Sequence, residues 1–526
     1  MSISEPINND VTTPQTDSLL GWSEQESSTT RHNSYTRNYF SRLNVSVYLT
    51  YLCSTASTAL PVVLLPTVAN ALVINLDDST DADDQAAYFC SRIASSSLMG
   101  TAFGKVINGY LVDLYGAKNT SFLYFLLGAL SLVCYSYSTS LIQLCLFNAA
   151  LEFSESLQWP AIQVVLVELS GSQMELEDGI WISSLASRSG ALLAMPLYAF
   201  VLDMGLDWRK LAFLGGIFWG FLGAVLMWLA IPHDAKKKQE NNRSRSHDIN
   251  SLAAPLLSHD NDDENNEDTS HARKSRSSVS YWAVLKSTPF WLVTIAHTGD
   301  SLLRTSEREV GTYFQDTAPP DGISSGTAGG MAVVLSAGVF VGLISLGGKF
   351  NRMVQSESEE GLREGWKRRK NIVVGLYIVA GLASFGLAVL ALPFVRTKLT
   401  DFLEKICFPS LSTHAITILQ LVHTFFMGVA NSINYYQIPS LLAATYGVNK
   451  GLCNSLFEAV AYALSAILWV LVGFAVESGG ADFLGWTYGW TIVTVIITIS
   501  GIVMVKFINL FYIERVWKDV HRFDDE

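Results

Sequence analysis

Five ionisable side chains recur at intervals of three or four residues, or side by side, within one otherwise apolar stretch: His297, Asp300, Arg304, Glu307 and Arg308. On a helix such spacing gathers side chains on one face. An ionisable group at bilayer depth costs about 2.5–3.5 kcal/mol, so it points to a function. Arg304, about midway through the stretch, offers a planar fork of donors suited to a carboxylate or phosphate. We therefore predict that Arg304 and Asp300 line a binding cavity. The alternative is an Asp300–Arg304 pair that only orients the helix, with Glu307 and Arg308 nearer the outer surface.

A second group of charges lies in other apolar stretches. Glu152 and Glu155 are one helical turn apart, Arg188 is near the middle of the next stretch, and Glu458 lies near the C-terminus. Burial favours the neutral form of a carboxyl group, which suits a proton carrier. We predict proton-coupling roles for Glu155 and Glu458, with Arg188 as a substrate-binding cation that can also neutralise Glu155. Glu152 is expected either in the cavity or at a shallow, hydrated position.

Neutral amides complete the set of candidate binding residues. Gln158 follows the two glutamates, and Asn431 lies in a polar run near residue 434. Both can hydrogen-bond a solute, although buried amides also join helices to one another.

These residues lie in a chain built mainly of apolar blocks. Hydrophobic residues make up 49% of the 526 residues and charged residues 16%, and the mean hydropathy is +0.29. A helix needs roughly 20 apolar residues to cross the bilayer core, and backbone in lipid must satisfy its own hydrogen bonds. We predict an all-α membrane protein with twelve transmembrane helices, near 43–72, 86–112, 120–139, 141–169, 178–203, 210–231, 287–314, 326–348, 371–394, 411–433, 446–476 and 486–513.

Lysine and arginine mark the orientation of these helices. They cluster in the loop after the eighth block, from Lys349 to Lys370, and in Lys236-Lys237-Lys238 after the sixth. Because cytoplasmic loops carry the excess of these residues, both termini should be cytosolic. The polar stretch 233–280 cannot bury enough apolar surface to fold alone. The predicted organisation is a cytosolic tail 1–42, a six-helix half 43–232, a disordered cytosolic loop 233–280, a six-helix half 281–513 and a cytosolic tail 514–526.

Several function classes lack a sequence signal. No basic stripe interleaved with aromatic residues suggests nucleic-acid binding. The six cysteines show no CxxC spacing, and no hydrolase or metalloprotease motif is present. We expect a monomer without cofactor or metal, whose partners are a small-molecule solute and the lipid bilayer, and which is not an enzyme.

One loop motif carries a family resemblance. Between the second and third blocks stands Gly109-x-x-x-Asp113-x-x-Gly116-x-Lys118. Gly109 permits close helix approach and Gly116 a tight turn. The motif resembles the cytosolic loop signature of the major facilitator superfamily. The resemblance implies two parallel six-helix halves that rock around a midplane site. It also implies that Asp113 latches against the start of helix 11, near Lys450.

A narrower resemblance concerns short patches. Gln158-Trp159-Pro160-Ala161, Gly179-Ile180-Trp181-Ile182-Ser183 and Asp207-Trp208-Arg209 are similar to the organophosphate–phosphate antiporters and their anion–cation symporter relatives. In the antiporters, arginines of helices 1 and 7 grip phosphate. Here Arg304 matches the second, but Cys53 lies near the place of the first, which argues against a phosphorylated substrate.

The sequence therefore favours a secondary transporter of a small polar solute, an organic anion by preference, with proton coupling through buried carboxylates. Two alternatives stay open. One is a non-transporting receptor or sensor on the same fold. The other is a transporter of a neutral or zwitterionic solute such as a sugar or an amino acid.

Overall fold

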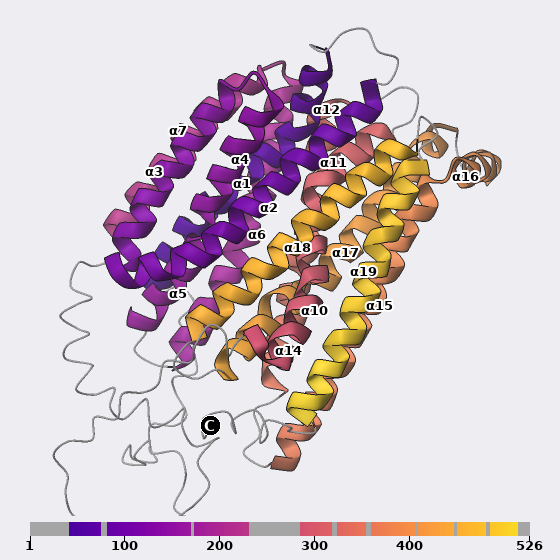
Figure 1. Ribbon diagram of the computed structural model, residues 1–526. Helices are drawn as coiled ribbons and strands as arrows, with labels where there is room; N and C mark the ends of the chain where they lie inside the picture. Colours follow the sequence, from indigo (N-terminus) through magenta and orange to yellow (C-terminus); the bar gives the residue numbers. More distant parts are fainter. Residues whose placement is uncertain are drawn as a thin grey trace, which may run out of the picture. The chain divides into compact units, whose positions relative to one another are not determined.

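A computed structural model of the protein shows the predicted helices (Figure 1). It describes residues 42–74, 82–169, 173–230, 285–317, 323–353, 359–406, 409–445, 450–479 and 484–513. These residues contain helices and no strand. The predicted polar loop 233–280 and both predicted tails lie outside the described residues.

The helices before the polar loop, here called the N-terminal set, coincide with the first six apolar blocks. They are α1 (Arg42–Ile74), α2 (Ala82–Tyr115), α3 (Ala117–Ser136), α4 (Leu141–Glu155), α5 (Gln158–Leu169), α6 (Gln173–Asp203) and α7 (Trp208–Ala230). The fourth block is split into α4 and α5.

The helices after the loop, the C-terminal set, coincide with the other six blocks. They are α10 (Thr288–Thr305), α11 (Glu307–Asp316), α12 (Ser325–Met331), α13 (Val333–Gly342), the π-helix η1 (Leu343–Gly347), α14 (Gly348–Arg352), α15 (Glu359–Ala391), α16 (Pro393–Ile406), α17 (Pro409–Thr445), α18 (Lys450–Ser478), α19 (Leu484–Ile508) and the π-helix η4 (Asn509–Ile513). Every predicted block is thus helical where it is described, and the chain is a twelve-span all-α membrane protein. The polar helix α16 was not predicted, because it is too short and too charged to cross a bilayer.

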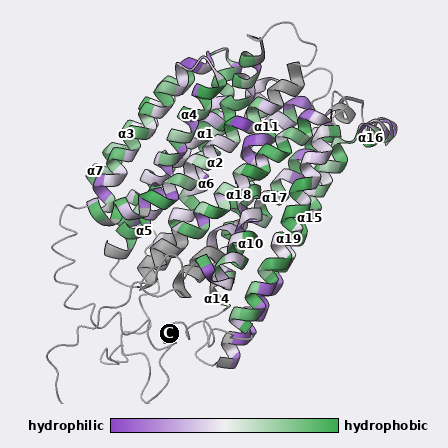
Figure 2. Ribbon diagram, in the orientation of Figure 1, coloured by the Kyte–Doolittle hydropathy of each residue, from purple (hydrophilic) through white to green (hydrophobic). Residues whose placement is uncertain are grey.

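Lipid explains which faces of these helices are apolar. Large hydrophobic side chains stay exposed along α3, α7 and α15, among them Leu130, Phe221 and Leu382, and Figure 2 shows these helices as largely hydrophobic. Within the described residues, nine runs are long and apolar enough to span a membrane. The blocks that fall short are α2, α4–α5 and α10–α11, which are the ones that carry Lys105, the two glutamates of the fourth block and the charges of the seventh.

Two breaks in these charged helices have local causes. Pro160 lacks an N–H and its ring crowds the carbonyl of Ser156, so the helix breaks at Ser156–Leu157. At Ser306 the hydroxyl donates to the Leu303 carbonyl at 2.7 Å, and the Thr305 hydroxyl donates to Ser301 at 2.7 Å. Such back-bonding bends helices. Both breaks fall beside charged residues.

The N- and C-terminal sets contact each other along α2 and α18. The Ser95 hydroxyl donates to the Ala466 carbonyl at 2.8 Å, and Lys105 Nζ lies 2.6 Å from Glu458 Oε2. A second contact joins α6 to α12, where Asp203 accepts hydrogen bonds from the hydroxyls of Ser324 at 2.6 Å and Thr327 at 2.7 Å. Figure 1 shows α18 running beside α2. The two sets therefore meet over a long interface, and the charged blocks lie in it.

Candidate functional site

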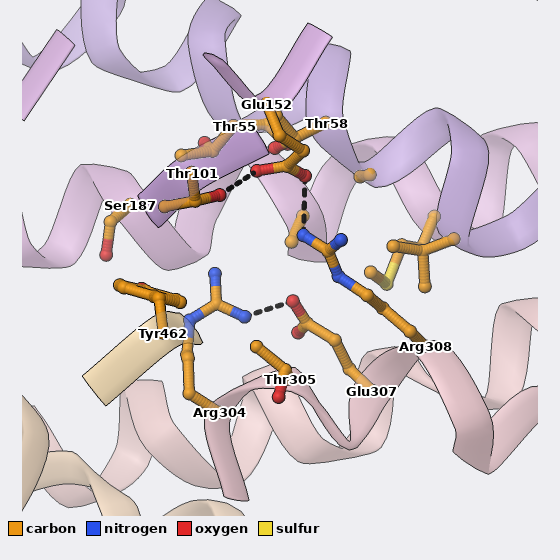
Figure 3. A pocket seen from close by; sticks show the side chains of 14 residues that line it. Thr55, Thr58, Thr101, Glu152, Ser187, Arg304, Thr305, Glu307, Arg308 and Tyr462 are labelled. Atoms are coloured by element: carbon orange, nitrogen blue, oxygen red, sulfur yellow. Dashed lines mark hydrogen bonds and ion pairs between the residues drawn. The ribbon is translucent and has the colours of Figure 1, made fainter. Parts of the chain in front are cut away.

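A cavity of about 80 Å³ lies between the two sets of helices. Its wall is made of hydroxyl, charged and small apolar side chains (Figure 3). The lining residues are Thr55, Thr58, Ala59 and Val62 of α1, Thr101 of α2, Glu152 of α4, Ser187, Ala191 and Met195 of α6, Arg304 and Thr305 of α10, Glu307 and Arg308 of α11, and Tyr462 of α18. Small-molecule pockets usually measure roughly 300–1,000 Å³. A solute larger than a small fragment thus requires the helices to move apart.

Arg304 reaches the cavity from the last turn of α10. It forms an ion pair with Glu307, three residues on and just beyond the break at Ser306. The Arg304 side chain keeps 21% of its surface exposed, against 7% for Glu307. Among the described residues, Glu307 is the hydrogen-bond partner of the guanidinium, so its other donors face the cavity (Figure 3).

Glu307 also contacts a second arginine. Arg188 Nη1 of α6 lies 3.5 Å from Glu307 Oε2, and the Ser336 hydroxyl of α13 donates to the same oxygen at 3.0 Å. Two guanidinium groups therefore share one carboxylate. This triad of Arg188, Arg304 and Glu307 has a formal charge of +1, because it holds two cations and one anion.

Arg188 is 1% exposed, and it forms further hydrogen bonds besides its contact with Glu307. Its Nε donates to the Tyr436 hydroxyl of α17 at 2.7 Å, and its Nη1 donates to Ser336 at 3.2 Å. The Tyr436 hydroxyl also lies 3.1 Å from the Ser187 hydroxyl. Arg188 thus spans the interface between the N-terminal and C-terminal sets and has little freedom to move.

A second ion pair crosses the cavity. Arg308 Nη2 of α11 lies 2.5 Å from Glu152 Oε1 of α4, and the Thr101 hydroxyl donates to Glu152 Oε2 at 3.2 Å. Glu152 is 8% exposed, so it lies in the cavity and not at a shallow, hydrated position. Breaking one partner of such a buried pair leaves an uncompensated charge, which is costly. The pair therefore joins the two sets.

The Asp300–Arg304 ion pair, which was the alternative to a cavity role, does not form. Asp300 is fully buried and accepts a hydrogen bond from the Tyr377 hydroxyl at 2.9 Å. Arg304 pairs instead with Glu307, three residues on, because helical spacing allows a partner on either side. Asn431, with its amide turned to satisfy both neighbours, donates to the Asp300 carbonyl at 3.1 Å and accepts from the Arg304 N–H at 3.2 Å. Neither Asp300 nor Asn431 lines the cavity; Asn431 joins the backbone of Asp300 and Arg304 to α17.

Glu155 and Gln158 lie at the break between α4 and α5, outside the cavity lining. Glu155 accepts a hydrogen bond from the Ser54 hydroxyl of α1. The suggested neutralisation of Glu155 by Arg188 is not found, because Arg188 is engaged by Glu307 and Tyr436. Gln158 accepts from the Ser121 hydroxyl and donates to the Ser121 carbonyl at 3.4 Å, so it joins α5 to α3.

The loop motif is described in part. Gly116 has φ of 82°, a left-handed conformation that favours glycine, and it precedes α3. This confirms the predicted tight turn. The Lys118 ammonium lies 5.0 Å from the centre of the Trp228 ring. Gly109 is within α2. The Asp113 side chain and the residues just before α18 lie outside what the structure describes, so the Asp113 latch stays a prediction.

The sequence did not indicate the hydroxyl residues of this site, among them Thr55, Thr58, Thr101 and Ser187. Ser336, Tyr436 and Tyr462 organise or line the cavity. A lone serine in the apolar helix α13 gives no signal. Tyr436 follows Asn431 and Asn434 in a polar run, which is the one hint that could have drawn attention to it.

Comparison with known proteins identifies the family. A family model described as the Major Facilitator Superfamily matches residues 47–399. A solved D-xylose-proton symporter is similar over 89% of this chain and 98% of its own, with a TM-score of 0.62 and 12% identity. The nucleoside transporter NupG is similar over 89% and 99%, with a TM-score of 0.55 and 15% identity. The xylose transporter XylE from E. coli, in an inward open conformation, is similar over 88% and 95%, with a TM-score of 0.58 and 12% identity. No curated protein matches the sequence significantly. At such identities the structural similarity shows a shared fold.

Proposed function

The chain belongs to the Major Facilitator Superfamily, and from that premise we propose that it is a secondary active transporter of a small organic anion bearing a carboxylate. The fold supports alternating access, in which two sets of helices move around a central site. The cavity between α1, α2, α4, α6 and α10, α11, α18 has the position that this mechanism requires.

One observation carries the choice of an anion. Arg188 and Arg304 share the single carboxylate of Glu307, which leaves one positive charge in excess in that triad. Arginine holds its charge at any working pH and binds carboxylates through two parallel hydrogen bonds. Arg304 is the more exposed of the two, so we assign it the first contact with the solute.

A zwitterionic solute such as an amino acid is the second candidate. The cavity lining also contains Glu152, paired with Arg308, and an ammonium group can approach that carboxylate while the solute carboxylate binds Arg304. Both candidates share the carboxylate, and they differ in whether a positive group is needed as well. A sugar could bind the neutral hydroxyls of the cavity wall, such as that of Tyr462, which pairs with Tyr435. It would leave the excess positive charge of the triad unused, so we place it behind the carboxylates.

A ligand-stabilisation screen tests this proposal. Purified protein is heated with panels of monocarboxylates, phosphate esters, amino acids and sugars, because a ligand that binds the folded state raises the unfolding temperature. We expect the carboxylates, with or without an ammonium group, to stabilise the wild type. The Arg368→Ala variant, which removes an arginine whose side chain is 68% exposed, should respond like the wild type. Stabilisation by sugars or phosphate esters alone would contradict the proposal.

The non-transporting receptor is separated from the transporter by flux. A receptor binds the same carboxylate without moving it into vesicles, so a positive screen must be followed by an uptake measurement. Conformational exchange around the cavity is the property that only the transporter requires.

A further inference from the structure

We infer that the Glu307 carboxylate occupies the subsite at which the carboxylate of the solute binds, so that the solute enters by displacing it. This inference rests on the proposed function and names the subsite within it. Its chemical class is a carboxylate group, whether carried by a simple organic acid or by an amino acid.

The donors around Glu307 form a complete carboxylate site. Arg304 binds one oxygen, while Arg188 Nη1 at 3.5 Å and the Ser336 hydroxyl at 3.0 Å approach the other. Charge-assisted hydrogen bonds of this kind are the strong ones in proteins. Glu307 is 5% exposed, and its carboxylate occupies Arg188 Nη1, the Ser336 hydroxyl and the Arg304 donor bonded to it. A solute carboxylate can take these same bonds only when Glu307 leaves them.

The two arginines differ in what they can release. Arg188 is fixed by Tyr436 and Ser336 and is 1% exposed. Arg304 keeps 21% of its side chain exposed in the cavity. A solute therefore meets Arg304 first, and the bond that it replaces is the one between Arg304 and Glu307.

Glu307 lies at a position from which its side chain can move away from Arg304. It is the first residue of α11, directly after the break at Ser306. Residues at a helix end beside a break are not locked by a full set of backbone hydrogen bonds on both sides. A rotation of the Glu307 side chain, or a small turn of α11 relative to α10, withdraws the carboxylate without disturbing Arg304.

Displacement of Glu307 by the solute also changes the contact between the N-terminal and C-terminal sets. Arg188 belongs to α6 of the N-terminal set and Glu307 to α11 of the C-terminal set, so their contact is a bridge between the sets. A solute carboxylate that takes the place of Glu307 inherits this bridge. Binding and the relative position of the two sets are thereby linked through one residue.

Acetate is the probe that tests the subsite. The subsite recognises the carboxylate group alone, and acetate is small enough for the present cavity. We compare acetate binding to the wild type, Glu307→Gln, Arg304→Ala and the double variant by thermal stabilisation. Glu364→Gln, which removes an exposed carboxylate on α15, controls for the loss of one negative charge.

Glu307→Gln removes the competing charge but keeps the size, so it should bind acetate roughly 10-fold more tightly than the wild type, as expected for the loss of one charged competitor. Arg304→Ala should abolish binding in both backgrounds, and Glu364→Gln should match the wild type. If Glu307→Gln does not fold, Glu307→Asp replaces it: the shorter carboxylate reaches Arg304 poorly, so acetate should again bind more tightly.

Equal or weaker acetate binding by Glu307→Gln, or by Glu307→Asp in its place, would overturn the inference while leaving the anion site intact, provided that Arg304→Ala still loses binding. If no variant and no wild-type protein responds to acetate, the proposed function itself is contradicted. The two failures are therefore distinct.

Discussion

Four glutamates of the membrane-spanning helices fall into two kinds according to their partners. Glu152, Glu307 and Glu458 each form an ion pair with an arginine or lysine. Glu155 forms no ion pair with any described residue, and its hydrogen-bond partner is the Ser54 hydroxyl. A half-buried carboxyl group without a cation beside it can take up and release a proton without breaking an ion pair. Among the predicted proton carriers, this setting favours Glu155 over Glu458.

Glu155→Gln should therefore abolish the acceleration of uptake by a pH gradient while exchange of solute for solute continues, because exchange needs no net proton movement. Glu458→Gln breaks a pair with Lys105 instead, so it should slow both processes about equally. Uptake and exchange are measured in vesicles with and without an imposed gradient. A Glu155→Gln protein that responds fully to the gradient would remove this residue from the coupling step.

Individual residues of the site also show what the sequence could and could not predict. The spacing of His297 to Arg308 singled out this block, and Arg304 does reach the cavity. Glu307 and Arg308 line the cavity as well, whereas the sequence placed them nearer the outer surface. An Asp300–Arg304 pair was the alternative reading of that spacing, because a helix places residues i and i+4 together. Glu307, at i+3, takes that place, and helical spacing alone does not distinguish the two partners. The contact of Arg188 with Tyr436 joins residues 248 positions apart, which no local pattern encodes.

Among the helices, α6 and α12 form a contact that the sequence did not predict. Asp203, the last residue of α6, accepts hydrogen bonds from Ser324 and Thr327 at the start of α12. Gly329 of α12 packs closely against α1, because a Cβ at this position would lie 2.3 Å from the Val63 carbonyl oxygen. Asn70 Nδ2 of α1 also lies 3.4 Å from Ser325 Oγ. These contacts hold the N- and C-terminal sets together at the end of the bundle opposite the Gly116 turn.

Asp203→Ala should loosen this contact. The two hydrogen bonds are partly solvent-exposed, so their loss is worth about 1 kcal/mol, which is roughly a five-fold shift toward separation of α6 from α12. Hydrogen–deuterium exchange of peptides covering Ser324–Leu335 should become faster by a similar factor.

Asp207→Ala is the matched control, because Asp207 lies four residues away and accepts a hydrogen bond from the Arg209 N–H within its own set of helices. It should leave exchange in Ser324–Leu335 unchanged. Equal exchange in the wild type and Asp203→Ala would mean that the glycine-lined packing holds this end without the carboxylate.

For the whole molecule, composition predicted the architecture well because the bilayer imposes a simple rule. A span must be long, apolar and helical, and all twelve apolar blocks are helical where described. The rule is weakest for α2, α4–α5 and α10–α11, whose charges lower their hydropathy. Those blocks were still recognised as apolar, and α2, α4, α10 and α11 contribute charged and hydroxyl side chains to the cavity wall.

What composition does not encode is how the two sets of helices meet. The cavity wall draws on seven helices from both sets, and its net charge depends on which arginine shares which glutamate. These pairings arise from tertiary packing, so the anion preference became a structural argument only once Arg188 and Arg304 were seen around Glu307. The orientation of the termini and the role of Asp113 remain sequence-based predictions.

The proposal that this protein transports carboxylates is tested most directly by uptake of labelled carboxylates into proteoliposomes containing purified protein. The solutes are those that stabilise the wild type in the ligand screen, and the proteins are the wild type, Arg304→Lys, Arg304→Ala and the control Arg368→Ala. Hydrogen bonds to charged groups contribute about 1.5–3 kcal/mol, so loss of the guanidinium should weaken apparent affinity by roughly 10- to 100-fold.

We predict saturable uptake by the wild type and Arg368→Ala, and weaker uptake by Arg304→Lys, which keeps the charge without the planar fork. In Arg304→Ala the apparent affinity should be roughly 10- to 100-fold weaker than in the wild type. Wild-type kinetics in Arg304→Ala would contradict the role proposed for Arg304. A wild-type protein that binds the carboxylate but moves none of it would contradict the proposed transport.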